Sequence, residues 1–196
     1  MTERALDRIG AFSDGVMAVA ITLLVLNIQV PTLEHGQTLG DALWDLLPSL
    51  GAFALAFGLV GRFWVIHHNL FERLRGFDQT LMLLNLGFLA AIVLIPFSAE
   101  LYDTYTDEGL AAAVLGANLG IAAAMHWAMT AHVMRSGLVH EERRDEQHQI
   151  GFGITTIFLI SVPGAFLSVH VAEALWISTV VARYPLRRLG RRTTSP

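Results

Sequence analysis

One apolar stretch near the N-terminus limits what this chain can fold into. Residues 8–31 read RIGAFSDGVMAVAITLLVLNIQVP, and about 20 mostly apolar residues are enough for a helix to cross a membrane. The run nevertheless contains Arg8 and Asp14 near its start and Thr22 in its middle. A charged side chain at the centre of a membrane helix costs roughly 2.5–3.5 kcal/mol on insertion scales. We therefore expect these groups to have partners in the fold or a functional role.

The composition agrees with a membrane protein. Of the 196 residues, 54% are hydrophobic and 15% are charged, whereas a soluble domain has about 25% charged residues. The chain has no cysteine, which excludes disulfides and thiolate metal sites. A basic start and the small residues 18–20 resemble a signal peptide, but those residues lie inside the apolar run. We expect a retained first helix.

Six apolar segments are predicted to be transmembrane helices, which gives an all-α, polytopic membrane protein. They cover residues 8–30, 46–68, 80–100, 109–134, 150–168 and 170–184. The sixth segment is short for a span, and we include it because the tail after it is strongly basic. No low-complexity stretch divides the chain, so residues 1–196 are expected to form a single six-helix transmembrane domain.

The arginines predict the orientation. With six spans, every basic residue falls on one side of the membrane: Arg4, Arg8, Arg62, Arg73, Arg75, Arg135, Arg143, Arg144, Arg183, Arg187, Arg188, Arg191 and Arg192. The positive-inside rule makes that side, with both termini, cytoplasmic. The predicted outer loops carry acidic residues instead: Glu34, Asp41, Asp45, Glu100, Asp103, Asp107, Glu108 and Glu173. Five spans would divide the arginines between the two sides.

Polar side chains gather in one predicted layer of the bundle. The layer comprises the motif R-x-x-x-F-S-D and residues of the next three segments: Arg8, Phe12, Ser13, Asp14, Trp64, His67, His68, Asn85 and His126. Asp14 lies about 240° around the helix from Arg8, so the two cannot pair within it. Lipid cannot satisfy such groups, which predicts hydrogen bonds between helices. A clamp between helices and a direct role in permeation both remain open for Asp14, and an interfacial position is the alternative for Trp64 and the two histidines.

The first helix also has an apolar stripe. Thr22, Leu23 and Leu26 lie within about 60° of the direction of Val19, and Asp14 points about 140° away. The helix is apolar all round, so periodicity alone does not single out this stripe. Narrow apolar rings can nonetheless gate or filter ions by controlling wetting. The chain has no H-E-x-x-H spacing, phosphate loop or nucleophile elbow, so we expect neither an enzyme nor a metal site.

At the R-x-x-x-F-S-D motif the sequence resembles the bacterial relatives of transmembrane protein 175, the endosomal and lysosomal potassium channel. Supporting matches are Trp64 with His67–His68, Asn85, and Pro96–Phe97. The resemblance implies one six-helix repeat per bacterial subunit and four subunits around a pore that the first helix lines. It also implies that no TVGYG filter loop is present, and this sequence has none.

The resemblance further implies roles for individual residues. The narrow apolar positions of the pore fall on Val19, Leu23 and Leu26, with Thr22 as the threonine of the pore helix. The Arg, Asp, Trp and His groups brace that helix against its neighbours. At the innermost ring a larger Ile or Leu is common, so Val19 is a departure that is expected to loosen ion discrimination.

The favoured function is a potassium-preferring cation channel of a bacterial plasma membrane. We expect a homotetramer, because one helix per chain cannot enclose a pore, with K⁺ and membrane lipid as partners and neither a cofactor nor nucleic acid. The alternative is a proton-coupled transporter of a small solute or ion in which Asp14 and His67 relay protons; it predicts discontinuous helices and an internal repeat. A third possibility is a non-conducting scaffold that packs partner helices through the small residues of the fourth segment: Ala111–Ala113, Gly116, Gly120 and Ala122–Ala124.

Overall fold

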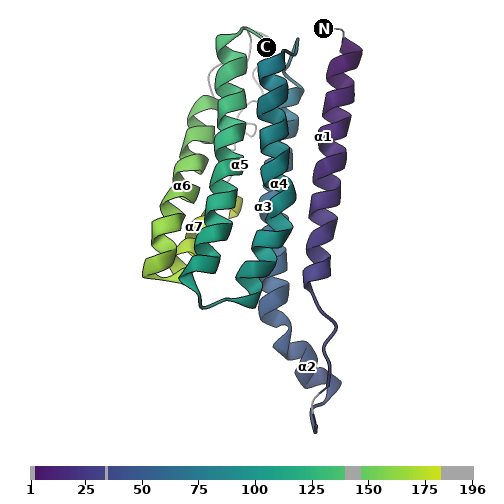
Figure 1. Cartoon of the computed structure of the whole chain (residues 1–196), viewed down its shortest axis with the longest axis vertical. Coiled ribbons are helices and arrows are strands. Elements are labelled where there is room, and N and C mark those ends of the chain that lie inside the picture. Colours follow the sequence, from purple (N-terminus) through teal and green to yellow (C-terminus); the bar gives the residue numbers. More distant parts are fainter. Residues whose placement is uncertain (1–2, 34, 140–146, 182–196) are drawn as a thin grey trace, which may run out of the picture.

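A computed structural model describes residues 3–33, 35–139 and 147–181. Within these ranges the chain forms seven α-helices and one 3₁₀ helix: α1 (Glu3–Leu23), η1 (Leu24–Asn27), α2 (Leu39–Asp45), α3 (Leu47–Phe71), α4 (Gln79–Thr104), α5 (Gly109–Arg135), α6 (Gln147–Leu167) and α7 (Val169–Val181). The long helices run alongside one another, and α2 projects from one end of the bundle (Figure 1). The all-α prediction is confirmed.

Four helical segments are long and apolar enough to cross a membrane. They are Leu6–Asn27, Leu47–Phe71, Gln79–Thr104 and Gly109–Arg135. The apolar parts of the last two helices are shorter, Phe152–Leu167 and Val169–Val181. At 1.5 Å per residue, the last of these is about 20 Å long, against about 30 Å of hydrocarbon. The prediction of six spans is thus supported for four helices, and residues 182–184 of the sixth predicted segment lie outside the described residues.

The predicted end of the first helix was wrong. We predicted a helix to residue 30, but the helical chain ends at Asn27, and Ile28 is extended with φ −85° and ψ 103°. Pro31 follows, and a proline disfavours the helical conformation of the residue before it. The sequence reading also missed α2. Its start is marked by a capping box, in which the Thr38 hydroxyl accepts from Asp41 N–H and the Asp41 carboxylate accepts from Thr38 N–H.

Other helix ends differ from the prediction by a few residues. α3 runs on to Phe71 and α4 to Thr104, so Arg62 lies well inside α3 and deeper than predicted. We expected the fourth helix to extend beyond residue 135, with a turn at Gly137. The turn is present, with φ +65°, but α5 ends at Arg135, and residues 140–146 lie outside the described part of the chain.

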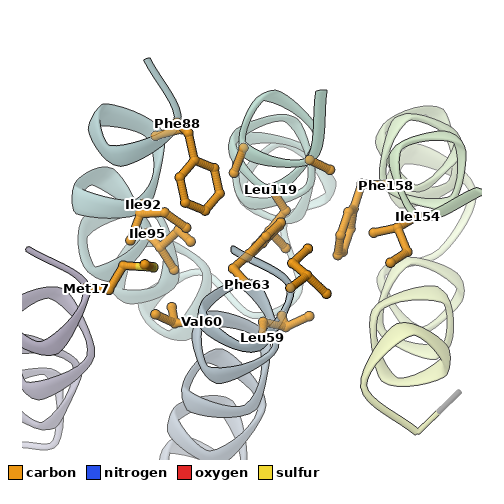
Figure 2. Packing of buried hydrophobic residues seen from close by; sticks show 14 of the residues in the cluster. Met17, Leu59, Val60, Phe63, Phe88, Ile92, Ile95, Leu119, Ile154 and Phe158 are labelled. Carbon is orange, nitrogen blue, oxygen red and sulfur yellow. The ribbon is translucent and has the colours of Figure 1, made fainter. Parts of the chain in front are cut away.

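A cluster of large apolar side chains holds the bundle together. Phe63 of α3 lies between Phe88 of α4 and Phe158 of α6, with ring centroids 6.0 Å from each. Met17 of α1 and Leu119 of α5 enter the same cluster (Figure 2). All five side chains are at most 2% exposed. The core therefore fixes α1 through one face only, while α3 to α6 enclose the centre.

Most arginines of the described residues lie at one end of the bundle, whereas acidic residues occur at both ends, including Glu72 after α3 and Asp78 before α4. Arg8 lies near the start of α1, and Arg73, Arg75 and Arg135 follow or end helices at the same end of the bundle (Figure 1). The opposite end carries acidic residues in α2 and between α4 and α5: Asp41, Asp45, Asp103, Asp107 and Glu108. The placement of these arginines agrees with the predicted orientation, which stays a prediction. Arg4 lies in α1, Arg62 in α3, Glu100 in α4 and Glu173 in α7. The other predicted topology residues lie outside the described ranges: Glu34, Arg143, Arg144, Arg183, Arg187, Arg188, Arg191 and Arg192.

Candidate functional site

Helix α1 has one face toward its own bundle and another that no part of the described chain covers. Ser13, Met17, Ala20 and Leu24 follow one another at helical spacing and are at most 1% exposed. The predicted stripe lies on another face: Val19 and Leu23 of α1 and Leu26 of η1 are 40–71% exposed. Folding of this subunit alone therefore leaves a continuous apolar stripe of α1 without a protein partner.

Thr22 interrupts this stripe with a hydroxyl group. The side chain is exposed, and its hydroxyl donates to the carbonyl oxygen of Val19 at 2.8 Å. The hydroxyl hydrogen is thereby directed back to the helix. The oxygen lone pairs are the part of the group left to face outward, where they can accept a hydrogen bond or contact a cation.

One side-chain hydrogen bond joins α1 to α3. Trp64 donates its indole N–H to the Asp14 carboxylate, with 3.0 Å between Nε1 and Oδ1. The indole in turn stacks on the ring of His68, with 5.4 Å between the centroids, and His68 Nε2 lies 3.2 Å from Glu72 Oε1. The Asp14 carboxylate of α1 is thus hydrogen-bonded to a side chain of α3.

A second, buried chain of hydrogen bonds joins α1, α4 and α3. Asn85 donates its amide N–H to Ser13 Oγ at 2.9 Å, and the Ser13 hydroxyl donates to the carbonyl of Ile9 at 2.9 Å. The Asn85 amide oxygen lies 2.9 Å from His67 Nε2, and because this oxygen only accepts, the proton of the neutral imidazole is on Nε2. Ser13, His67 and Asn85 are at most 1% exposed. Their polar atoms satisfy one another, as burial requires.

The structure does not bring every predicted member of the layer into this network. His67 contacts Asn85 rather than Asp14. His126 lies beyond Phe88, which stacks on the His67 ring at 5.1 Å and meets the His126 ring edge-on at 5.8 Å. Arg8 and Phe12 are both exposed. Sequence periodicity predicts depth in the bundle, but it does not predict which side chains meet across helices.

Two anchoring contacts near the ends of the helices were missed by the sequence reading. Asn27, the last residue of η1, donates to the carbonyl oxygen of Pro96 at 3.0 Å. This contact ties the far end of α1 to α4. At the acidic end, Tyr102 of α4 donates to Glu173 of α7, whose other carboxylate oxygen accepts from His170 at 3.0 Å. Isolated polar residues within apolar segments are the signal that could have suggested both.

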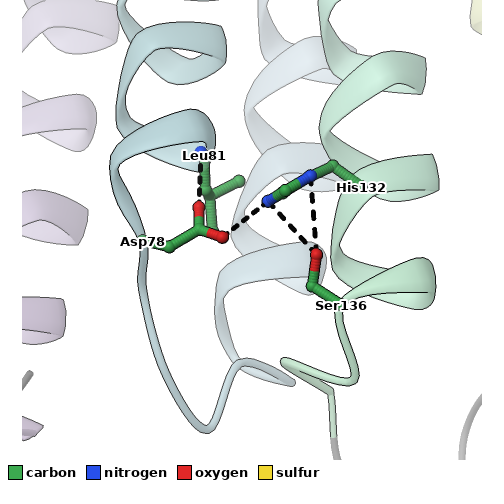
Figure 3. Close-up of polar contacts among 4 residues, drawn as sticks. All are labelled: Asp78, Leu81, His132 and Ser136. Atoms are coloured by element: carbon green, nitrogen blue, oxygen red, sulfur yellow. Dashed lines mark hydrogen bonds and ion pairs between the residues drawn. The ribbon is translucent and has the colours of Figure 1, made fainter.

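A third missed cluster lies at the turn that starts α4. Asp78 Oδ1 accepts from Leu81 N–H at 2.8 Å, and Oδ2 accepts from His132 Nε2 of α5 at 2.8 Å (Figure 3). Ser136 lies 3.3 Å from the same nitrogen. The Leu81 amide and, less strongly, His132 hold the pKa of the Asp78 carboxyl below its usual range. Asp78 is recognisable in sequence as an N-cap residue, but His132 is not.

The described residues contain no group of three or more His, Asp or Glu side chains that could hold a metal ion. The polar groups around α1 are instead used in contacts between helices. What the arrangement offers chemically is a rigidly held helix with an uncovered apolar stripe and one hydroxyl.

Comparisons with known proteins place the chain in a group of related membrane proteins. Residues 8–96, which include most of α1, all of α3 and most of α4, match the family described as endosomal/lysosomal potassium channel TMEM175. A protein of Streptomyces collinus that is named a potassium channel is 36% identical over 142 residues, which are 70% of this chain and 69% of the relative. A protein of Chamaesiphon minutus with the same kind of name is 34% identical over 184 residues, which are 87% of this chain and 91% of the relative.

A crystal structure and a vertebrate protein are also similar to this chain. The crystal structure described as a lysosomal potassium-selective channel TMEM175 homolog from Chamaesiphon minutus has a TM-score of 0.81 at 27% identity, covering 92% of this chain and 96% of that chain. The mouse protein named endosomal/lysosomal proton channel TMEM175 is 38% identical over 110 residues, which are 52% of this chain but 22% of the mouse protein. These relatives are named as channels and not as enzymes, and they confirm the resemblance found in the sequence.

Proposed function

The chain belongs to the TMEM175 family, and from this premise we propose that it is a potassium-preferring cation channel whose pore is lined by α1. The observation that carries the proposal is the division of α1 into two faces. Ser13 and Asp14 are bonded to α4 and α3, whereas Val19, Leu23 and Leu26 are left uncovered by their own subunit. A stripe of this kind is suited to face a pore in an assembly of several chains.

The assembly is a homotetramer in a bacterial plasma membrane. One α1 stripe cannot enclose a pore, so conduction requires several copies around an axis. Four copies would form successive rings of Val19, Leu23 and Leu26, and apolar rings control ion passage through wetting. The relatives that cover most of this chain come from bacteria, which supports the choice of membrane.

Thr22 supplies the polar element of the proposed pore. Its hydroxyl donates to Val19, which leaves the oxygen lone pairs available to a partly dehydrated K⁺ ion. Four such hydroxyls do not replace a complete hydration shell, as rings of backbone carbonyls do. Selectivity for K⁺ over Na⁺ is therefore modest, and the small side chain of Val19 at the innermost ring loosens it further.

Purified protein in planar bilayers tests this function. Under a K⁺/Na⁺ gradient, we expect unitary currents with a reversal potential displaced toward that of K⁺. Absence of current across several lipid compositions and pH values would reject the proposal. Because vertebrate relatives are named proton channels, a pH gradient at symmetric K⁺ should be applied to the same bilayers to measure proton permeation separately.

The two other readings of the sequence gain less support. In a proton relay, Asp14 and His67 would exchange protons, but each bonds to a different partner, Trp64 and Asn85 respectively. A scaffold would need the small residues of α5 to be available to other proteins. This requirement is not met at the two glycines, because Gly116 packs against Ser161 and Gly120 against Leu159 within the same chain.

A further inference from the structure

We propose that the crevice between α1 and α3 is a binding site for a lipophilic monoamine, whose ammonium group meets Asp14 and whose apolar body fills the crevice. The crevice has a volume of about 340 Å³, within the usual range of roughly 300–1,000 Å³ for small-molecule sites. It lies away from the uncovered stripe of α1. Binding there is a property separate from ion conduction, and it can be measured without any current.

One wall of the crevice is a face of α1. Asp14, Met17, Ala18 and Ile21 line it, and their spacing of three, one and three residues places them on one side of the helix. The carboxylate is at one end of this wall, and the rest of the wall is apolar. Val19, at the centre of the proposed pore stripe, does not line the crevice.

The other wall is a face of α3. Val60, Gly61 and Trp64 line it. A Cβ atom at Gly61 would meet no atom within 4 Å, so there is open space beside this glycine that a larger side chain would occupy. The Trp64 side chain is 42% exposed. An indole is the aromatic group that attracts an ammonium ion most strongly, and this attraction grows when water is excluded.

The charges of the crevice favour a cation over a neutral ligand. Asp14 Oδ1 accepts the indole N–H of Trp64, a neutral donor, and among the described residues no ion pair neutralises the carboxylate. A carboxylate in an otherwise apolar groove binds an ammonium group with a charge-assisted hydrogen bond, which is stronger than a neutral one. A lipid acyl chain would also fit the apolar walls, but it would leave the charge of Asp14 unpaired.

The probe is tritiated 1-adamantylamine, with 1-adamantanol as a neutral compound of nearly the same shape. Binding to the full-length protein in nanodiscs is measured by equilibrium dialysis, with protein-free nanodiscs subtracted. We expect saturable binding that unlabelled amine displaces and that the alcohol displaces at least about tenfold less well. Equal displacement by the alcohol would overturn the proposal, because it would show that the crevice takes any apolar body.

Three variants locate the site. Asp14→Asn removes the charge and should weaken amine binding at least about tenfold. Gly61→Leu fills the crevice while Asp14 keeps its charge, and it should weaken binding by a similar factor, so the test remains valid if Asp14→Asn does not fold. Gly51→Leu is the matched control, because Gly51 is also an α3 glycine with no atom within 4 Å of an added Cβ and does not line the crevice. Binding that is absent in the wild type, or unchanged by Gly61→Leu, would contradict the assignment.

Discussion

The indole N–H of Trp64 is bonded to the Asp14 carboxylate across the boundary of α1 and α3, at 3.0 Å. This bond and the buried pair Ser13–Asn85 hold α1 from the side opposite its uncovered stripe. The Asp14 charge, which is costly inside a membrane helix, thus has a hydrogen-bond partner on the neighbouring helix. The apolar residues proposed to face the pore lie on the other side of the helix from these two hydrogen bonds.

Removal of this bond should destabilise the bundle. Trp64→Phe keeps an aromatic ring but leaves the carboxylate without its donor, and loss of a hydrogen bond to a charged group costs about 1–3 kcal/mol. The free energy of unfolding, measured by denaturant titration in detergent, should fall by that amount. The control is Trp44→Phe in α2, where the side chain is 71% exposed and a change within about 0.5 kcal/mol is expected. Equal losses in both variants would contradict the clamp.

The buried chain from Ser13 to His67 should behave as a coupled unit. Asn85→Leu deprives both Ser13 and His67 of a partner and should cost more than the roughly 1–3 kcal/mol of one unsatisfied group. Ser13→Ala combined with Asn85→Leu should cost less than the sum of the single changes, because either change alone already removes the hydrogen bond between the two side chains. A double-mutant cycle on the free energy of unfolding measures this coupling, and strict additivity would show that the two contacts are independent.

Features of the fold and the candidate site that depend on a single helix could be predicted from the sequence, whereas contacts between helices could not. The stripe of Val19, Leu23 and Leu26 follows from the period of a single helix, and these side chains are exposed. Val25, on another face, is 52% exposed as well, so exposure does not single out the stripe, which stays a prediction. Trp64 was expected near Asp14 because both lie at similar depth. His67 contacts Asn85 and not Asp14 because of the relative rotation and axial shift of three helices. The hydrophobic periodicity of a single helix does not predict these quantities. The short helix α2 was missed because seven residues are too few for a repeat to be recognised.

The stripe of α1 should control ion discrimination. Leu23→Ala or Leu26→Ala widens an apolar ring, so conductance should rise and the K⁺/Na⁺ permeability ratio should fall. A loss of about 1 kcal/mol of discrimination corresponds to roughly a fivefold lower ratio. Val25→Ala is the control, because Val25 is 52% exposed but lies about 120° from Val19 around the helix. Reversal potentials in planar bilayers measure the effect, and unchanged conductance and selectivity in both leucine variants would reject the pore stripe.

The Asp78 contact should make stability depend on pH. The pKa of Asp78 is lowered from 3.8, first by the Leu81 amide and also by His132, so the carboxylate stabilises the fold above its unfolded pKa and loses this contribution as the pH falls through the lower, folded value. Asp78→Asn can still cap α4 but removes the charge. It should therefore lower the melting temperature at pH 7 more than at pH 3. A difference that is the same at both pH values would contradict the role of the charge.

The packing of α5 against α6 should not tolerate a methyl group at Gly116. A Cβ atom there would lie 2.7 Å from Ser161 Oγ, which accepts the indole N–H of the fully buried Trp176 at 2.9 Å. Neither side chain can move without breaking that bond, so Gly116→Ala should cost about 1–3 kcal/mol of unfolding free energy. Gly51→Ala in α3 has open space around the new methyl group and should instead stabilise its helix by up to about 1 kcal/mol. Denaturant titrations of the two variants should therefore shift in opposite directions, and a stabilised Gly116→Ala protein would show that α5 and α6 are less closely packed than this contact requires.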